Sequence, residues 1–308
     1  MKKLEYKDYW FNYVLKANPQ EIKNLIQEEY INSQNYRIHL DIYDKEGLSD
    51  QTIIFIHGTS VYSRFYAEFC YNLFQNGYRV VAPDLIGHGM SEGKRGHFTM
   101  EMFAKTIYDV NTYVRGKFGD NVVVMGSSLG GITTLYSVAY DIRFKAGICH
   151  NAAIFNEEAY KKIIKVEGKL KELIEEVPKL AETAPTSSLS VYTYLDFHKL
   201  TNSEEMNKKV DLLMKDKILS DKYTMTAIYT QMSAPLARSL ESIKTPLMII
   251  NGDKDYLFST DYMTEIFERL TCEHKKLEIL KGTSHLIFQE NIKESLERIL
   301  PWLKLVLS

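Results

Sequence analysis

The chain has 308 residues, of which 45% are hydrophobic and 25% charged, and its formal net charge is -2. This composition is typical of a globular protein with a sizeable core, and it excludes the basic surface that binds nucleic acid. The apolar runs are too short to span a bilayer, and Met1-Lys2-Lys3 is not followed by the apolar stretch of a secretion signal. The three cysteines are odd in number and widely spaced, which favours free thiols and a cytoplasmic protein.

The first part of the chain, residues 1–30, is predicted to be a helical extension with two short helices divided by Pro19. Each helix has an apolar stripe, made first of Trp10, Phe11, Val14 and Leu15 and then of Ile22, Leu25 and Ile26. Such stripes favour packing on the core, and the alternative is an arm that docks on a membrane surface or a partner. Residues 36–43 alternate between apolar and polar side chains, which predicts a half-exposed strand near a sheet edge.

From Thr52 onward, short apolar runs are separated by helical stretches. Six of these runs are predicted to be strands: Ile53–Ile56, Arg79–Ala82, Val122–Met125, Ala146–Cys149, Leu247–Ile250 and Leu277–Leu280. Continuous apolar strands are typical of a mostly parallel central sheet with helices on both faces, so the predicted fold class is α/β. One covering helix is expected to begin at Thr99, and the closing helix to lie just before Pro301.

The interval 155–242 breaks this alternation and shows helical periodicity only. It has an apolar face opposite a solvated Lys and Glu face, and the apolar residues are Ile163, Val166, Leu170, Leu173, Ile174 and Val177. An aromatic and methionine-rich set, expected to line an apolar pocket, comprises Tyr192, Tyr194, Phe197, Met214, Met225, Tyr229 and Met232. The interval is therefore predicted to be a helical cap inserted into an α/β core made of residues 31–154 and 243–308.

The segment Gly126-Ser127-Ser128-Leu129-Gly130 joins a predicted strand to a predicted helix. A turn this sharp strains the backbone at its apex, and the two glycines remove side chains that would collide there. The hydroxyl of Ser128 is then lifted above the sheet at the positive end of a helix, where an alkoxide and a neighbouring oxyanion are stabilised. Ser128 is the candidate nucleophile.

Three other loops follow predicted strands: His57-Gly58-Thr59, the run from Asn251 to Asp255, and the run from Gly282 to His285. Loops at the carboxyl ends of parallel strands share one edge of the sheet, so all three should converge on the serine. A serine hydroxyl needs a base, imidazole titrates near neutrality, and a carboxylate holds the imidazole tautomer. Both Asp253 and Asp255 are candidates for that carboxylate, and small residues near Gly58 let a backbone N–H approach an oxyanion.

The chain from about Ile38 to Trp302 resembles the α/β-hydrolase superfamily. The segment Asp84-Leu-Ile-Gly-His-Gly-Met-Ser-Glu-Gly93 is similar to the Gly-His-Gly-x-Ser-x-Gly segment of its monoacylglycerol lipase and lysophospholipase branch, which His57-Gly58 also matches. The resemblance implies roles for five residues: Ser128 as nucleophile, Asp255 as acid, His285 as base, and the N–H groups of Thr59 and Leu129 as oxyanion donors. Because the family acid usually sits three residues after the glycine, Asp255 is favoured, and Asp253 becomes a turn residue or a support.

We therefore expect a serine hydrolase that cleaves small-molecule carboxylic esters with an apolar acyl group, such as a monoacylglycerol or a lysophospholipid, through an acyl-enzyme on Ser128. Transient contact with a membrane surface is compatible with this reading. A thioesterase or an aminopeptidase of the proline iminopeptidase type would carry the same three residues. The aminopeptidase would need acidic residues in the cap, for which Glu157, Glu158, Glu204 and Glu205 are available. A non-catalytic binding protein of the same fold is the remaining alternative.

The other histidines are not assigned to catalysis. His57, His88 and His97 are expected to brace loops. His39, His150, His198 and His274 lack metal-ligand spacing, so no metal is expected. The proposed chemistry also needs no cofactor.

Overall fold

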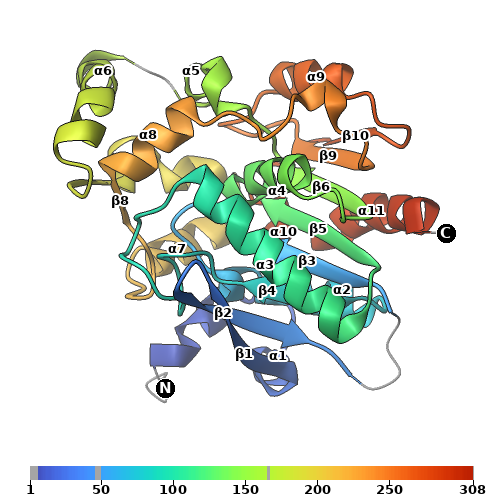
Figure 1. Cartoon of the computed structure of the whole chain (residues 1–308). Coiled ribbons are helices and arrows are strands. Elements are labelled where there is room, and N and C mark those ends of the chain that lie inside the picture. Colours follow the sequence, from blue (N-terminus) through green and yellow to red (C-terminus); the bar gives the residue numbers. More distant parts are fainter. Residues whose placement is uncertain (1–5, 46–49, 165–166, 308) are drawn as a thin grey trace.

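A computed structural model describes residues 6–45, 50–164 and 167–307. Its main sheet has eight strands in the order β1-β2-β4-β3-β5-β6-β9-β10 (Figure 1). The strands are β1 (Ile26–Ser33), β2 (Tyr36–Tyr43), β3 (Thr52–Ile56), β4 (Arg79–Pro83), β5 (Val122–Ser127), β6 (Ala146–His150), β9 (Leu247–Gly252) and β10 (Lys276–Leu280). All neighbours from β4 to β10 are parallel, whereas β2 pairs antiparallel with both β1 and β4. All six strands predicted from apolar runs are present.

Helices cover both faces of this sheet, as predicted (Figure 1). On one face α3 (Met100–Phe118) packs beside α4 (Leu129–Tyr140), and on the other α2 (Ala67–Gln75) contacts α10 (Ile287–Glu290) and α11 (Ile292–Leu307). A further helix, α9 (Thr260–Arg269), lies against β9 and β10. The strands β3, β5, β6 and β9 are buried along their whole length, because both of their faces are covered.

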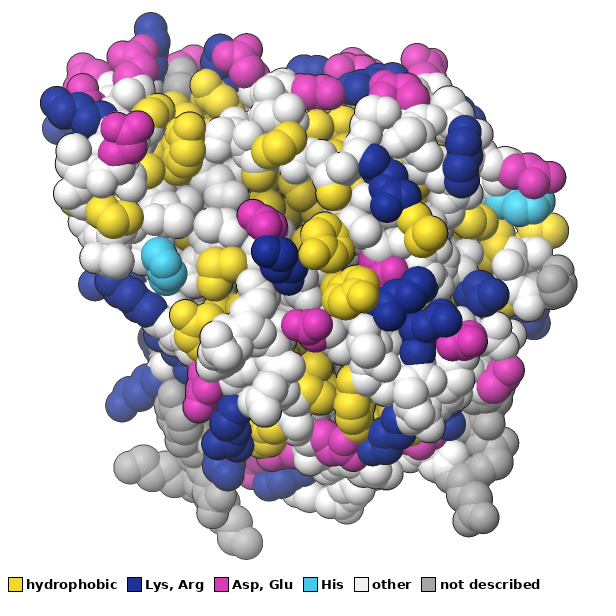
Figure 2. Space-filling model, viewed as in Figure 1, with side chains coloured by type: hydrophobic (Ala, Val, Ile, Leu, Met, Phe, Trp, Pro, Cys, Tyr) yellow, Lys and Arg dark blue, Asp and Glu magenta, His cyan; other side chains and the backbone are white. Residues whose placement is uncertain are grey.

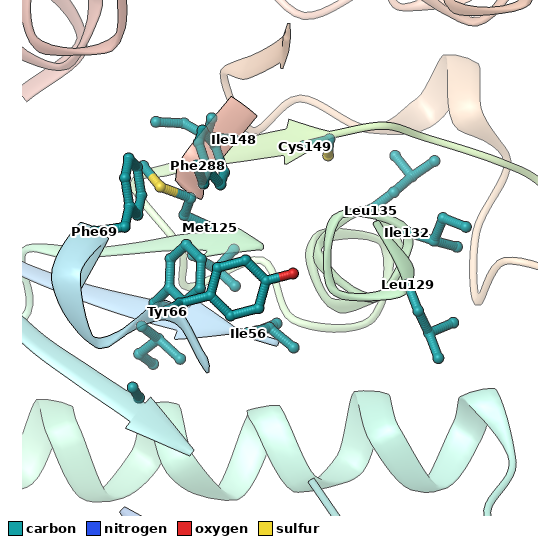
Figure 3. Close-up of a cluster of buried hydrophobic side chains, with 14 of the residues drawn as sticks. Ile56, Tyr66, Phe69, Met125, Leu129, Ile132, Leu135, Ile148, Cys149 and Phe288 are labelled. Atoms are coloured by element: carbon teal, nitrogen blue, oxygen red, sulfur yellow. The ribbon is translucent and has the colours of Figure 1, made fainter. Parts of the chain in front are cut away.

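The core between the sheet and its covering helices is apolar and tightly packed. Figure 3 shows Phe69 of α2 and Phe288 of α10 beside Met125 of β5, and the two phenyl rings stack with centroids 4.1 Å apart. The predicted start of α3 is confirmed, since the Thr99 side chain accepts a hydrogen bond from the backbone N–H of Met102. The three cysteines are free and buried. None of the helices in the described ranges is both long enough and apolar enough to cross a membrane.

The sequence suggested that the closing helix ends before Pro301. In the structure this helix, α11, continues through Pro301 to Leu307. Proline removes one backbone donor, yet the ring of Pro301 is on the exposed side of α11. Trp302 and Leu303, which follow it, are buried in the core. Their burial offsets the missing hydrogen bond and keeps the last turns helical.

The first 30 residues are not helical throughout. A 3₁₀ helix, η1 (Tyr6–Tyr13), and α1 (Pro19–Leu25) are followed by β1, so residues 26–30 form a strand instead of a helix. Gln34 and Asn35, both with positive φ (52° and 66°), close the two-residue hairpin to β2. β2 lies next to the outer strand β1 and so is near the sheet edge, as predicted, but it is not half-exposed, because its polar residues His39 and Asp41 are fully buried.

The N-terminal segment, residues 6–25, packs on the core, as the favoured alternative predicted. Trp10 and Ile22 are fully buried. The carboxylate of Glu68 on α2 accepts the backbone N–H groups of residues 15–17 at 2.7, 2.8 and 2.7 Å. The hydroxyl of Tyr13 donates to Asp216, which lies between β6 and β9 in sequence, at 2.6 Å. The segment therefore contacts both the core and the inserted interval.

We propose that the chain between β6 and β9 forms one inserted cap, residues 155–242. Its elements are η3 (Phe155–Glu157), α5 (Tyr160–Ile163), α6 (Gly168–Thr183), β7 (Ser188–Ser190), η4 (Val191–Thr193), η5 (Phe197–Leu200), α7 (Glu204–Leu213), β8 (Lys222–Thr224), α8 (Met225–Ser233) and η6 (Leu240–Ser242). The expectation of helices only is wrong, because β7 and β8 pair antiparallel. Val166 of the predicted apolar face lies outside the described residues. In Figure 1, α5, α6 and α8 lie above the sheet.

Candidate active site

Ser128 occupies the turn between β5 and α4, with its backbone in the left-handed region at φ 57° and ψ -120°. Its N–H donates to the carbonyl of His150 at 2.9 Å, and its side chain does not cap α4. The turn requires glycine, because a Cβ at Gly126 would lie 2.2 Å from the carbonyl oxygen of Gly130. A Cβ at Gly130 would lie equally close, at 2.2 Å, to the carbonyl oxygen of Ile56. This strained turn presents the serine hydroxyl at a helix N-terminus.

His285 and Asp255 are in direct contact, since Nδ1 of the imidazole lies 2.8 Å from Oδ2 of the carboxylate. Asn151 also donates to Oδ2, and the backbone N–H groups of Leu257 and Phe258 donate to Oδ1. Burial raises the pKa of Asp255, but the neighbouring His285 outweighs it and holds that pKa below its usual value. Because an ionised carboxylate only accepts hydrogen bonds, Nδ1 of His285 carries the proton in this contact.

Asp253, the competing acid, makes a different contact. Its Oδ1 accepts the backbone N–H of Gly282 at 2.6 Å and so ties the acid loop to the loop that carries His285. These two loops pass very close to each other, because a Cβ at Gly252 would lie 2.4 Å from the carbonyl oxygen of Thr283. Of the two candidate acids, Asp255 is therefore the one that contacts the imidazole.

Two pockets meet at Ser128. The larger has a volume of about 880 Å³, including space open to solvent, and Ser128, Thr59 and Leu129 are among its lining residues. The smaller, about 450 Å³ by the same measure, is lined by Ser128, Thr59 and His285 among others. The structure thus brings the predicted nucleophile and base to one pocket, and the nucleophile and both predicted oxyanion residues to the other.

The walls of the larger pocket differ from the prediction. Of the aromatic and methionine-rich set, Tyr194 and Met232 line it and Phe197 lines the smaller pocket, whereas Tyr192, Met214, Met225 and Tyr229 line neither. The cap wall is instead the aliphatic face of α5 and α6, with Ile163, Leu170, Leu173, Ile174 and Val177. Figure 2 shows hydrophobic side chains between the charged outer residues of this upper region. Among the described lining residues, none is Asp, Glu, Lys, Arg or His.

His150, at the end of β6, is a neighbour that the sequence did not suggest. Its ring centroid lies 5.3 Å from that of His285, and its Nδ1 lies 2.8 Å from Oγ of Ser127. Its Nε2 is buried and has no hydrogen-bond partner among the described residues. Burial and the neighbouring His285 lower the pKa of His150 to about 3, so the ring is neutral near pH 7. A second imidazole therefore lies behind the candidate base.

Two clusters of described residues hold three potential metal-ligand atoms within 4.8 Å of one another: His150, Asp255 and His285, and Glu28, His39 and Asp41. In the first, Asp255 already holds His285. In the second, Arg64 pairs with both carboxylates. Contacts within the chain thus account for the carboxylates of each cluster and for Nδ1 of His285, whereas Nε2 of His150 and Nε2 of His39 have no hydrogen-bond partner among the described residues.

The segment that carries the family resemblance, Asp84 to Gly93, is a scaffold beside the site. The carboxylate of Asp84 accepts the backbone N–H groups of Ser63 and Met90 at 2.8 and 2.7 Å. A side chain at Gly89 would collide with it, since a Cβ there would lie 2.2 Å from that carboxylate. His39, whose Nδ1 lies 3.1 Å from Oδ2, helps to hold the pKa of Asp84 well below its usual range, although burial alone would raise it.

The histidines predicted to brace loops do so. Nε2 of His57 accepts the backbone N–H of Leu85 at 3.0 Å. His88 lies 3.0 Å from the hydroxyl of Tyr223, and burial lowers its pKa to about 3. His97 contacts the cap, since its Nδ1 lies 3.0 Å from the hydroxyl of Thr224. His57 thus joins two loops of the core, whereas His88 and His97 connect the core to the cap.

Comparison with known proteins identifies the family and the fold. A family described as "Serine aminopeptidase, S33" matches residues 48–292. A monoacylglycerol lipase of Mycolicibacterium smegmatis is 23% identical over 261 residues, covering 82% of this chain and 88% of the lipase. A carboxylesterase of Bacillus subtilis is 22% identical over 248 residues, with 77% and 85% covered. Among solved structures, a Paleococcus ferrophilus monoacylglycerol lipase superposes with a TM-score of 0.71 at 21% identity, covering 91% of this chain and 99% of that one.

Proposed function

Because the chain belongs to the serine aminopeptidase S33 family, and within the α/β hydrolases to the monoacylglycerol lipase-like branch, we propose that it is a serine hydrolase that cleaves carboxylic esters with an apolar acyl group. The relatives support the coarser statement, a hydrolase of the esterase or lipase type. The finer statement, which concerns the acyl group and the residues that react, is our own and depends on the site geometry.

In the proposed reaction, Ser128 attacks the ester carbonyl carbon while Nε2 of His285 takes its proton. Asp255 holds the imidazole and stabilises the imidazolium. The backbone N–H groups of Thr59 and Leu129 donate to the oxyanion of the tetrahedral intermediate. The bond to the alcohol oxygen then breaks, His285 returns the proton to that oxygen, and the acyl group stays on Ser128. Water, activated by the same imidazole, attacks the acyl-enzyme and releases the carboxylic acid.

One observation carries the choice of substrate. The hydrogen-bonded pair of Asp255 and His285 lies beside Ser128, which opens into a pocket whose described walls carry no charged side chain. Burying an acyl chain against aliphatic walls is favourable, whereas burying an unpaired charge there is costly. These walls therefore favour a substrate whose acyl group is apolar.

The aminopeptidase alternative lacks such support. A substrate ammonium would need a carboxylate in the pocket, and the four candidates in the cap line neither pocket. Glu157 pairs with Arg269, Glu158 with Lys161 and Glu204 with Lys208, all near the surface, and Glu205 is exposed. Amino-acyl amides should therefore be poor substrates.

The test combines labelling with a substrate series. A fluorophosphonate probe should label the wild-type protein on Ser128 and leave a Ser128→Ala variant unlabelled. With nitrophenyl esters from acetate to decanoate, kept below their micelle concentrations, kcat/KM should rise roughly a hundredfold for three to four added carbons, at about 0.8 kcal/mol for each buried CH₂. A flat series would contradict the apolar acyl pocket, and a folded protein that does not label would contradict the enzyme assignment.

A further inference from the structure

The two pockets that meet at Ser128 differ in which reacting groups they contain. The larger is lined by Leu129 but not by His285, and the smaller by His285 but not by Leu129. Ser128 and Thr59 belong to both. Each pocket is therefore next to a different part of the proposed reaction.

That difference fixes which half of an ester occupies which pocket, provided that the proposed function holds. As the C–O bond breaks, His285 must give its proton to the alcohol oxygen. This transfer requires the ring nitrogen that carries the proton to lie about 3 Å from that oxygen. The alcohol half therefore leaves on the side of His285, in the smaller pocket. The acyl group stays on Ser128 with its oxygen toward the N–H groups of Thr59 and Leu129, so its chain extends into the larger pocket.

The smaller pocket has largely apolar walls. Val210 and Leu213 of α7 and Leu200 of η5 approach from the cap, and Val61 and Phe65 approach from the core. Among its described lining residues, the side chains with polar atoms are Thr59, Tyr66 and the two reacting residues, Ser128 and His285.

The hydroxyl of Tyr66 lies at the reacting end of the smaller pocket. A Cβ at Gly58 would lie 2.9 Å from this hydroxyl and 3.4 Å from Cβ of Ser128. In Figure 3 it points toward α4, the helix that carries Leu129. A polyol or a phosphorylated head group that extends from there along Leu200, Val210 and Leu213 would leave buried polar groups without partners, which is costly.

We propose that the smaller pocket binds the alcohol half of the ester, and that this half is an uncharged apolar alcohol, such as a short alkyl or benzyl alcohol, instead of glycerol or a phosphorylated head group. The proposal rests on the proposed function of the same site. It makes α7 and η5 the cap elements that select the alcohol, while α5 and α6 select the acyl chain.

The experiment varies the alcohol and keeps the acyl group constant. Ethyl, butyl and benzyl butanoate are compared with 1-butanoylglycerol on the full-length protein. All share one acyl-enzyme, so differences in kcat/KM report the acylation step, in which the alcohol is still present. Each methylene buried from water should raise kcat/KM about fourfold, so butyl should exceed ethyl butanoate by about tenfold or more. The glycerol ester should be at least about tenfold slower than the butyl ester.

A matched pair of variants tests the assignment of the pockets. Leu213→Ala, in the smaller pocket, should reduce the ratio of butyl to ethyl butanoate and leave the ratio of ethyl hexanoate to ethyl butanoate unchanged. Leu173→Ala, on α6 in the larger pocket, should do the reverse. Val210→Ala serves in place of Leu213→Ala if that variant does not fold.

The outcomes separate the two proposals. If 1-butanoylglycerol is hydrolysed as fast as butyl butanoate, or if Leu213→Ala alters the acyl ratio alone, the alcohol pocket is wrong while the esterase stands. If no ester is hydrolysed and the fluorophosphonate does not label Ser128, the proposed function itself fails and the pocket assignment falls with it.

Discussion

The loops around Ser128 and the cap above them are held in very different ways. At the sheet edge, Asp255 accepts hydrogen bonds from two side chains and two backbone N–H groups, and Asp84 braces a neighbouring loop in a similar way. In the cap, α6 has 16 residues, of which only Ile174 and Val177 are buried. The reacting groups are thus fixed by short turns and buried polar contacts, while the walls that meet the substrate are held mainly by apolar packing. Substitutions in the two regions should therefore have different effects on the protein.

The largest effect is expected from Ser128→Ala, which removes the proposed nucleophile without adding a larger side chain to the turn between β5 and α4. Turnover should fall on the order of 10⁶-fold, as in another serine hydrolase that lost its nucleophile. The circular dichroism spectrum and the denaturant midpoint should stay unchanged, because the side chain of Ser128 makes no capping bond. Substantial ester turnover by a rigorously purified variant would contradict the proposed role.

The next largest effect separates the two acids of one loop. Asp255→Asn should lower turnover on the order of 10⁴-fold, the loss seen when a triad Asp becomes Asn elsewhere. The matched control, Asp253→Asn, weakens the bond to the Gly282 N–H, and turnover should change far less. If the Asp253 variant is the more impaired, the imidazole is held by a different carboxylate from the one proposed.

A smaller effect, on stability, should come from His150, whose buried ring packs against the ring of His285. Its folded pKa is lowered to about 3, so below its unfolded pKa near 6.5 the unfolded chain binds a proton that the folded chain does not. Stability therefore falls as the pH is lowered from about 6.5 toward 3, by up to about 1.4 kcal/mol for each pH unit.

The variant His150→Asn keeps a polar atom near Ser127 and removes this titration. Between pH 7 and pH 5, its free energy of unfolding should drop by up to about 2 kcal/mol less than that of the wild type. Denaturant titrations at the two pH values measure the difference. His88 remains in the variant and retains its own acid sensitivity. Identical pH dependence in the two proteins would show that His150 is not buried as a neutral ring.

The smallest effect concerns the link between the N-terminal segment and the cap. Burial raises the pKa of Tyr13, and its protonated hydroxyl donates to Asp216. Tyr13→Phe should therefore lower the free energy of unfolding by about 1 kcal/mol. Tyr9→Phe is the control, since the hydroxyl of Tyr9 contacts the carbonyl of Leu212 in a less buried place, and its loss should be smaller. A larger loss for Tyr9 than for Tyr13 would contradict this ranking.

Features encoded by local pattern could be predicted from the sequence. Ser128 lies between a continuous apolar run and a helix, and the sharp turn around it is indicated by Gly126 and Gly130. The six core strands and the start of α3 at Thr99 depend on near neighbours in the chain, which is why their positions were close to those in the structure. Contact between Asp255 and His285 could be proposed because both follow parallel strands, whose ends share an edge.

Features that depend on distant contacts were missed. The hairpin at Gln34 and Asn35 lacks the glycine that usually marks such a turn, so the sequence pattern predicts helix where residues 26–30 form the first part of β1. The ring of His150 meets His285 only because β6 and the loop after β10 pack together, and nothing in its spacing indicates this. The pocket walls were misassigned for the same reason, since Met214 and Tyr229 are 42% and 40% exposed whereas aliphatic residues of α6 face inward.

The N-terminal segment has a mechanical consequence for the cap. The chain itself joins the cap to the core at the two ends of the cap. Between these ends, the carboxylate of Asp216 accepts hydrogen bonds from the hydroxyl of Tyr13 in the N-terminal segment and from the hydroxyl of Tyr62 in the core. The core also contacts the cap at Tyr223 and Thr224, through His88 and His97, so the side of the cap that carries α7 and β8 is held by several hydrogen bonds. We therefore expect the α6 side, where only Ile174 and Val177 are buried, to move more readily than the α7 side. Movement of the α6 wall would accommodate acyl chains of different lengths, while the wall that selects the alcohol would keep its shape.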